Sequence, residues 1–219
     1  MLRLPVCLLL SATGAIAQNA AQNNVVLENE HVRVLKVTSQ PHRKTRLHEH
    51  KMNRVMIYLQ PGRQVTAFQG GTNKNLEWKA GEALWSPAAG MHTAETVSES
   101  PVTIVEIELK NKGTSAKAGA IPLDPVRIDP KRYRVEFEND QVRVVRVSLG
   151  GKQSIPMHEH ALYRVTTNLT PQNFKVTGAD DSVAAVQRGA GEVAWGTPSK
   201  HMEENLSAEP FEAIMVELK

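Results

Sequence analysis

An internal duplication constrains this chain more than any other feature, because two copies of one sequence pattern predict two copies of one fold. The segment LENEHVRVLKV at residues 27–37 matches FENDQVRVVRV at residues 137–147, which lies 110 residues further along. A later deletion shortens the spacing to 109 residues. The polar residues that repeat at these spacings include the pairs His48/His158, His50/His160, Arg54/Arg164, Glu82/Glu192 and His92/His201.

Each copy has the residue pattern of β-strands. Short alternating runs rich in Val, Ile and Thr, such as VRVLKV and TIVEIEL, are separated by Gly, Pro, Asn and Asp. No window of a dozen residues has helical periodicity. With 41% apolar and 22% charged residues, the chain can bury a core. We therefore expect an all-β protein whose antiparallel strands close over an apolar interior.

The chain begins with the pattern of a secretory signal peptide. MLRLPVCLLLSATGAIA at residues 1–17 has a positive charge, a short apolar stretch and a final Ala-Ile-Ala. No apolar stretch reaches the roughly 20 residues that a transmembrane helix needs. We expect a secreted or periplasmic protein with no membrane attachment after cleavage. The predicted organisation is a first barrel at 18–110, a linker at 111–131 that packs in part on a barrel, and a second barrel at 132–219.

Charge and cysteine content exclude several kinds of site. The net charge is +3, but lysines and arginines alternate with acidic residues, so we predict no nucleic-acid or membrane-surface partner. The only cysteine is Cys7, which would be lost with the signal peptide. Disulfides and thiolate ligands are therefore not expected in the mature protein. A metal ion would have to use histidine, carboxylate or thioether ligands.

The repeated histidines predict a metal site in each copy. Residues i and i+2 of a strand share one face and lie about 6.5 to 7 Å apart, so both imidazoles of a His-x-His can approach one ion. A third ligand must then come from a neighbouring strand. The predicted ligand sets are His48, His50 and His92 in the first copy and His158, His160 and His201 in the second. The alternative is a polar barrel mouth that binds no metal.

These motifs resemble those of the cupin superfamily. RLHEH and PMHEH match the His-x-His of the first cupin motif, and GEALWSPAAGMH at 81–92 follows the second motif. GEVAWGTPSKH at 191–201 is one residue shorter and lacks the second glycine. The resemblance covers nearly all of the predicted mature chain and implies two tandem cupin-type jelly-roll β-barrels, a bicupin. It implies little about activity, because cupins include dioxygenases, decarboxylases, isomerases, storage proteins and ligand-binding regulators.

Two arginines depart from the cupin pattern, which has a ligating glutamate four residues after the second histidine. Arg54 and Arg164 stand there instead, and a cation cannot replace that ligand. On the histidine face, a guanidinium could bind a substrate carboxylate through two hydrogen bonds. However, Val55, Ile57 and Leu59 form the better apolar row, and a core on that side would turn Arg54 toward water.

For several residues beside the motifs, the simplest prediction is a position on the surface with no part in a site. His31 and His42 do not repeat in the second copy, so we expect both on the surface. Glu95 and Glu204 follow the last motif histidine by three residues. They could orient a ligand histidine, but solvated strand ends are the simpler prediction.

Two functions are compatible with the sequence. One is a secreted metalloenzyme in which Fe, Cu, Zn, Ni or Mn acts as a Lewis acid or oxygen activator on a small organic substrate. The other is a non-catalytic cupin that binds a small anionic or sugar-like ligand through Arg54 and Arg164. No general acid or base can be identified. The resemblance and exposed apolar strand edges also favour a homodimer.

Overall fold

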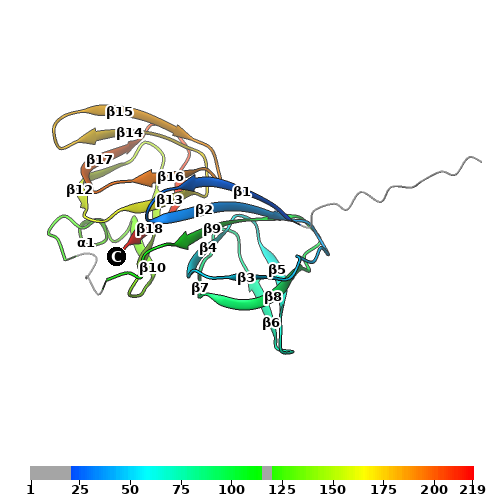
Figure 1. Cartoon of the computed structure of the whole chain (residues 1–219). Helices are drawn as coiled ribbons and strands as arrows, with labels where there is room; N and C mark the ends of the chain where they lie inside the picture. The colour runs from blue at the N-terminus through cyan, green and yellow to red at the C-terminus, as the bar shows by residue number, and fades with distance from the viewer. Residues whose placement is uncertain (1–20, 115–119) are drawn as a thin grey trace, which may run out of the picture.

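The computed structural model describes residues 21–114 and 120–219, so the predicted signal peptide lies outside the described residues. Strands dominate this part of the chain, and its helical content is the short α1 (Pro125–Ile128) (Figure 1). The predicted all-β class is therefore confirmed. Within the same residues, no helix reaches the length and apolarity that a membrane crossing requires.

The first unit, which runs from β1 to β9, is a jelly roll of two antiparallel sheets. In spatial order, the larger sheet consists of β1 (Ala21–Glu28), β2 (Val32–Ser39), β9 (Val102–Leu109), β4 (Arg54–Tyr58) and β7 (Ala83–Ser86). The smaller sheet consists of β3 (His48–His50), β8 (Ala89–Thr96), β5 (Gly62–Phe68) and β6 (Asn73–Trp78).

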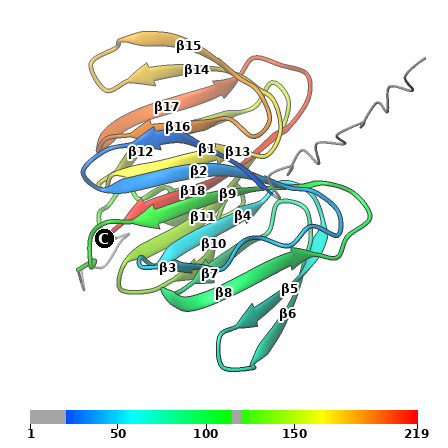
Figure 2. The same cartoon turned by 45° about the vertical axis from the view of Figure 1, so that its right-hand side comes forward.

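The second unit, from β10 to β18, repeats this topology strand for strand, as the duplication predicts. Its larger sheet consists of β10 (Tyr133–Glu138), β11 (Val142–Leu149), β18 (Phe211–Leu218), β13 (Arg164–Asn168) and β16 (Val193–Gly196). Its smaller sheet consists of β12 (Ser154–His160), β17 (Ser199–Asn205), β14 (Gln172–Gly178) and β15 (Val183–Arg188). The hairpins β5–β6 and β14–β15 lie at opposite ends of the molecule (Figure 2).

A large apolar core lies between the two units. It is formed by residues on the larger sheets of both, and its fully buried members include Ile57 and Ile107 from the first unit and Val144 and Val216 from the second. Each unit also has an interior core of its own, which includes Met56 and Tyr58 in the first unit and Leu149 and Phe174 in the second. The larger sheets are therefore covered by apolar side chains on both faces.

Strand β4 shows how this arrangement affects Arg54. Val55 and Ile57 belong to the core between the units, whereas Met56 and Tyr58 belong to the interior of the first unit. Because strand side chains alternate between faces, Arg54 shares the interior face with Met56 and Tyr58. The apolar row is buried, as expected, but its burial does not turn Arg54 toward water, since all five residues of β4 are buried.

Part of the predicted linker, residues 111–131, packs against the second unit. The amide of Glu159 donates a 2.8 Å hydrogen bond to the carbonyl of Leu123. Val126, in α1, contacts the interior core of the second unit. The Asp124 side chain caps the helix by accepting from the amide of Arg127. The linker is thus attached to the second unit along this stretch.

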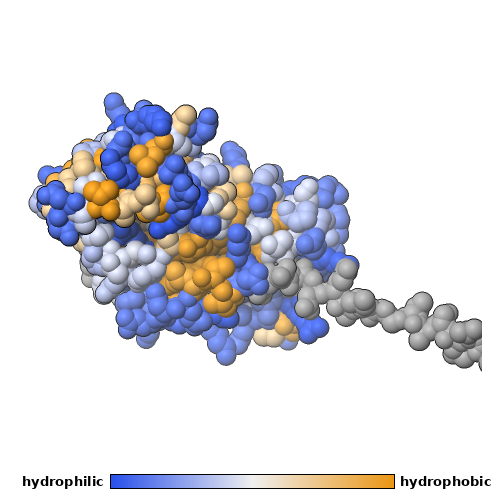
Figure 3. Space-filling view, turned by 90° about the horizontal axis from the view of Figure 1, so that it is seen from above, coloured by the Kyte–Doolittle hydropathy of each residue, from blue (hydrophilic) through white to orange (hydrophobic). Residues whose placement is uncertain are grey.

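The face seen in Figure 3 has hydrophilic areas interrupted by apolar ones. Several exposed apolar side chains lie on strands at the edges of sheets. Val25 and Val26 on β1 are each 46% exposed, and Val183 on β15 is 64% exposed. Exposed strand edges can pair with another chain, and the homodimer stays a prediction.

Candidate metal centres

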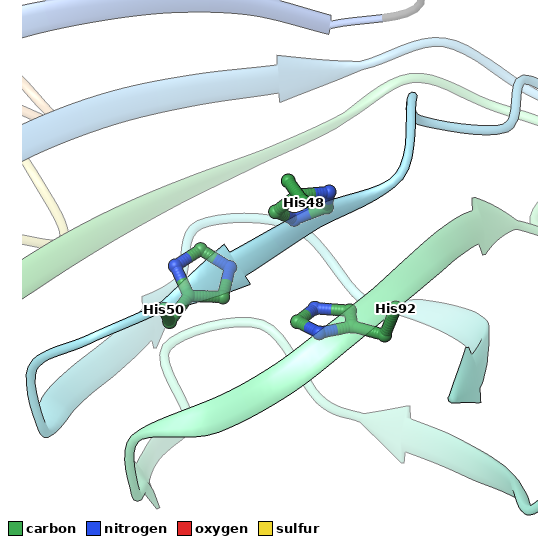
Figure 4. Close-up of side chains that lie close together, drawn as sticks. All are labelled: His48, His50 and His92. Carbon is green, nitrogen blue, oxygen red and sulfur yellow. The ribbon is translucent and has the colours of Figure 1, made fainter. Parts of the chain in front are cut away.

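The pairing of β3 with β8 brings the histidines of the first unit together. His48 lies directly opposite His92, and His50 follows on the same face of β3. The three rings converge on one point (Figure 4), with centroids 4.5 to 5.2 Å apart. One ligand nitrogen from each ring lies within 4.8 Å of the others. The structure therefore groups these residues as the sequence predicts.

The pairing of β12 with β17 builds the same group in the second unit. His158 lies opposite His201, and His160 completes the set, again with one ligand nitrogen per ring within 4.8 Å of the others. All three residues are buried, whereas in the first unit only His92 is. The second site is therefore more enclosed than the first.

Backbone carbonyls fix the tautomer of three of these imidazoles. Nδ1 of His48 lies 2.7 Å from the carbonyl oxygen of Arg46, and Nδ1 of His92 lies 2.7 Å from that of Gly90. Nδ1 of His158 lies 2.9 Å from the carbonyl oxygen of Pro156. Because a carbonyl oxygen can only accept, Nδ1 must carry the proton. In His48 and His92 the Nε2 lone pair is then left to bind a metal ion, whereas in His158 it faces the hydroxyl of Tyr133, whose hydrogen bond a metal ion would have to replace.

Burial keeps His50 and His158 neutral by lowering their pKa values. Desolvation, followed by the charge of Arg54, lowers the pKa of His50 to about 3. Desolvation also lowers the pKa of His158 to about 4, despite the opposing effect of Glu203. Neutral imidazoles are the form that binds metal, so neither ring has to lose a proton near pH 7. Each group thus offers three imidazole nitrogens, the donor type that binds a divalent transition-metal ion.

Arg54 forms a buried ion pair beside the first site. Its Nη1 lies 3.0 Å from Oε2 of Glu106, and its Nη2 donates to Oγ of Ser86 at 2.9 Å. Burial raises the pKa of Glu106, and Arg54 opposes that shift. Both side chains line a cavity of about 460 Å³ together with the three histidines. Sequence reasoning missed Glu106, which has Met215 as its counterpart in the second unit.

Arg164 has a different environment. Its guanidinium donates to the carbonyl of Thr197 at 2.6 Å and to Oγ of Ser199 at 3.0 Å. Among the described residues, no carboxylate forms an ion pair with it, and burial lowers its pKa. It lines a cavity of about 360 Å³ that also contains His160 and His201. The charges of Glu203 and Glu217 act on this guanidinium from a distance and partly oppose the effect of burial on its pKa.

Two further residues approach the second site, and sequence reasoning missed both. Oε1 of Glu203 lies 3.3 Å from Nε2 of His201. The hydroxyl of Tyr133 lies 3.1 Å from Nε2 of His158, where it can donate because Nδ1 carries the proton. The available signal was the position of Glu203 two residues after His201, on the same strand face. Neither residue repeats, since Ala94 and Asn23 are the counterparts in the first unit.

A buried network supports His160 from behind. Its Nδ1 lies 3.2 Å from Oε1 of Glu217, whose other oxygen accepts from Nε of Arg143 at 2.5 Å. Arg143 also donates to Asp124 at 2.6 Å. A carboxylate behind a ligating histidine fixes its ring and strengthens it as a donor. The network thus holds His160 toward the site from the linker and from two strands.

The remaining predictions beside the motifs have mixed outcomes. Glu204 forms an exposed ion pair with Lys175, which agrees with a solvated strand residue. His42 is exposed and interacts with Glu99, as expected. The surface position predicted for His31 is wrong, because its ring stacks on Tyr163 of the second unit with centroids 4.5 Å apart. The turn before β2 is packed against the other unit, which the sequence of one unit does not reveal.

Comparison with known proteins identifies the fold. No family model matches the sequence, and no curated protein matches it. AerE from Microcystis aeruginosa is similar in structure, with a TM-score of 0.65 and 12% identity over 93% of this chain and 95% of that protein. A cupin 2 conserved barrel domain protein from Leptotrichia buccalis has a TM-score of 0.54 and 12% identity, over 93% of this chain and 91% of that one.

Oxalate decarboxylase from Bacillus subtilis, a protein described with Mn(II) centres, is also similar. Its TM-score is 0.62 at 12% identity, and the match covers 90% of this chain and 72% of that one. At such identities the likeness establishes the arrangement of strands and leaves the chemistry to the residues of the site.

Proposed function

We propose that this chain, a bicupin by fold, is an exported protein that holds a divalent metal ion at each histidine triad and uses it on a small organic anion. The observation that carries the proposal is the convergence of three imidazoles in each unit, within 4.8 Å at their ligand nitrogens. The manganese described in the similar oxalate decarboxylase supports a metal in this fold. Export is supported by the signal-like residues 1–17.

The charge of the second cavity supports an anionic ligand. Arg164 is a largely buried cation whose hydrogen bonds go to a carbonyl and a hydroxyl. A carboxylate would offset the cost of burying this charge and could accept two parallel hydrogen bonds from it. In the first unit Glu106 already neutralises Arg54, so a ligand there gains less from the guanidinium.

The residues of each site would divide the work. A bound divalent ion supplies Lewis-acid or oxygen-activating chemistry. The Nδ1 hydrogen bonds of His48, His92 and His158 hold those rings in place, so that little reorganisation is needed when a ligand arrives. Arg164 would orient the carboxylate of the substrate toward the histidines that share its cavity.

A non-catalytic role is the second candidate, and the arginines favour it. Replacing a ligating glutamate with Arg in both units removes a carboxylate that metal cupins use, yet retains polar cavities that suit a small anion. Turnover of any small carboxylate that is lost in His160→Ala would exclude this role. Metal-loaded protein that binds a small carboxylate but does not convert it would favour this role.

Elemental analysis of the exported protein tests the proposal. We expect one divalent ion for each unit, and loss of one when His48, His50 and His92 are replaced by Ala. Replacing His158, His160 and His201 should remove the other. His42→Asn is the control, since the His42 side chain is exposed and pairs with Glu99, which belongs to neither triad. Protein that stays metal-free after incubation with each of Fe, Cu, Zn, Ni and Mn would overturn the proposal.

A further inference from the structure

We infer that Glu203 is a fourth ligand of the second metal site and supplies the carboxylate that the first cupin motif lacks in this chain. The inference rests on the proposed metal-binding function. It goes beyond that function because it assigns a ligand from β17, at a position where the first unit has Ala94. The two sites would then differ in donor set, with nitrogen alone in the first unit and nitrogen plus oxygen in the second.

The distance between Glu203 and His201 fits two ligands of one ion. Oε1 lies 3.3 Å from Nε2 of His201. Two ligands held about 2.1 Å from one ion lie about 3.0 Å apart at a right angle and about 3.4 Å apart at the tetrahedral angle. Glu203 and His201 are i and i+2 on β17, so both side chains point into the same cavity. The group whose ligand atoms already lie within 4.8 Å of one another consists of the three histidines, so the carboxylate, which is close to His201, has to move toward His158 and His160 to share an ion with them.

The charge around Glu203 also calls for a cation. Its side chain is only 17% exposed, and its ion-pair partner in the described part of the chain is His201. Arg164 lines the same cavity but directs its hydrogen bonds to Thr197 and Ser199. The charge of Arg164 attracts Glu203 across the cavity, but the carboxylate forms no direct ion pair with it among the described residues, and a largely buried carboxylate without a direct cationic partner is costly. A divalent ion at the triad would compensate it directly.

In the first unit, the position that matches Glu203 carries no ligand, and Glu108, which also lines that cavity, lies 3.5 Å from Nη1 of Arg33. Ala94 has no donor, and the carboxylate of Glu106 is hydrogen-bonded to Arg54. Oxygen ligands favour hard ions such as Mn²⁺, whereas a site of imidazoles alone suits Zn²⁺, Cu²⁺ or Ni²⁺. We therefore expect the second site to bind Mn²⁺ more tightly than the first.

A reciprocal exchange of residues tests this ligand. The second site is isolated in a full-length background with His48, His50 and His92 replaced by Ala, and the first site by the corresponding change in the second triad. Titration calorimetry and electron paramagnetic resonance then follow Mn²⁺ binding. In the protein that keeps only the second site, E203Q should weaken Mn²⁺ binding by about tenfold or more. In the protein that keeps only the first site, A94E should strengthen Mn²⁺ binding.

Controls separate this inference from the proposed function. E204Q removes a neighbouring carboxylate that pairs with Lys175 at the surface, and it should leave Mn²⁺ affinity unchanged. Equal affinity in E203Q and its parent background would overturn the ligand assignment while metal binding itself stands. A parent background that binds no Mn²⁺, Co²⁺ or Zn²⁺ would overturn both. If circular dichroism shows that E203Q does not fold, A94E decides, and no gain in affinity there would overturn the assignment.

Discussion

At the scale of single residues, one amino acid has two roles in this molecule. Arg54 and Arg164 occupy matching positions. Arg54 pairs with Glu106 at 3.0 Å, whereas in the described part of the chain no carboxylate forms a direct ion pair with Arg164. Met215 stands at the position of Glu106 in the second unit, which leaves Arg164 without that partner. One substitution on the neighbouring strand thus decides whether the guanidinium is neutralised within the protein or open to a ligand.

The buried pair gives a prediction about stability. Arg54→Ala should destabilise the protein by roughly 3 kcal/mol, because it leaves the Glu106 carboxylate buried without its partner. Adding Glu106→Met should recover much of this loss, since methionine already occupies the matching position 215. Urea denaturation of the two variants measures both effects. A double variant no more stable than Arg54→Ala would show that the uncompensated carboxylate is not the cause.

At the scale of elements, strand pairing determines which site residues were predictable. The His-x-His motifs and the duplication were sufficient to group six histidines, because their positions on β3, β8, β12 and β17 follow from alternation. The orientation of Arg54 was ambiguous, since β4 is buried on both faces and alternation cannot distinguish two cores. Glu203 was missed because a single acidic residue near a strand end resembles a solvated one, and it has no repeat to mark it.

The paired histidine strands also predict a pH dependence. The folded pKa is about 4 for His158 and about 3 for His50, below the unfolded value of about 6.5. Between these values the unfolded chain binds protons that the folded chain does not. The metal-free protein should therefore have its full stability above about pH 6.5 and lose it as the pH falls toward 4.

Urea midpoints of chelator-treated protein at about pH 7 and about pH 5 measure this loss. His158→Gln should reduce the difference between the two midpoints. His42→Asn should not, because His42 is exposed and its positive φ of 53° is a conformation that asparagine tolerates. A midpoint that does not change with pH in the parent protein would contradict the prediction.

At the scale of the whole molecule, the core between the units joins them into one cooperative structure. It buries residues of β2, β4 and β9 against residues of β11, β13 and β18. The aromatic stack of His31 with Tyr163 and Trp195 adds contacts across the same boundary. Contacts on this scale favour unfolding of both units together.

Ile107→Ala tests this cooperativity. Ile107 is fully buried in the core between the units, and its truncation should cost about 2 to 5 kcal/mol. Scanning calorimetry should show one transition that moves to lower temperature as a whole. Val183→Ala, at a residue that is 64% exposed, should have almost no effect. Two separate transitions, only one of which moves, would show that the units unfold independently.

The shared core has a consequence for how the two sites can diverge. In a homodimer of identical chains, every substitution at one site appears at the other as well. Here the two halves are parts of one chain and share a buried apolar core. A mutation therefore changes the site in one half and leaves the site in the other half unchanged. Two positions show such differences between the repeats: the second unit has Tyr133 where the first has Asn23, and Glu203 where the first has Ala94. The fusion allows one half to change its ligand set while the other half keeps its own.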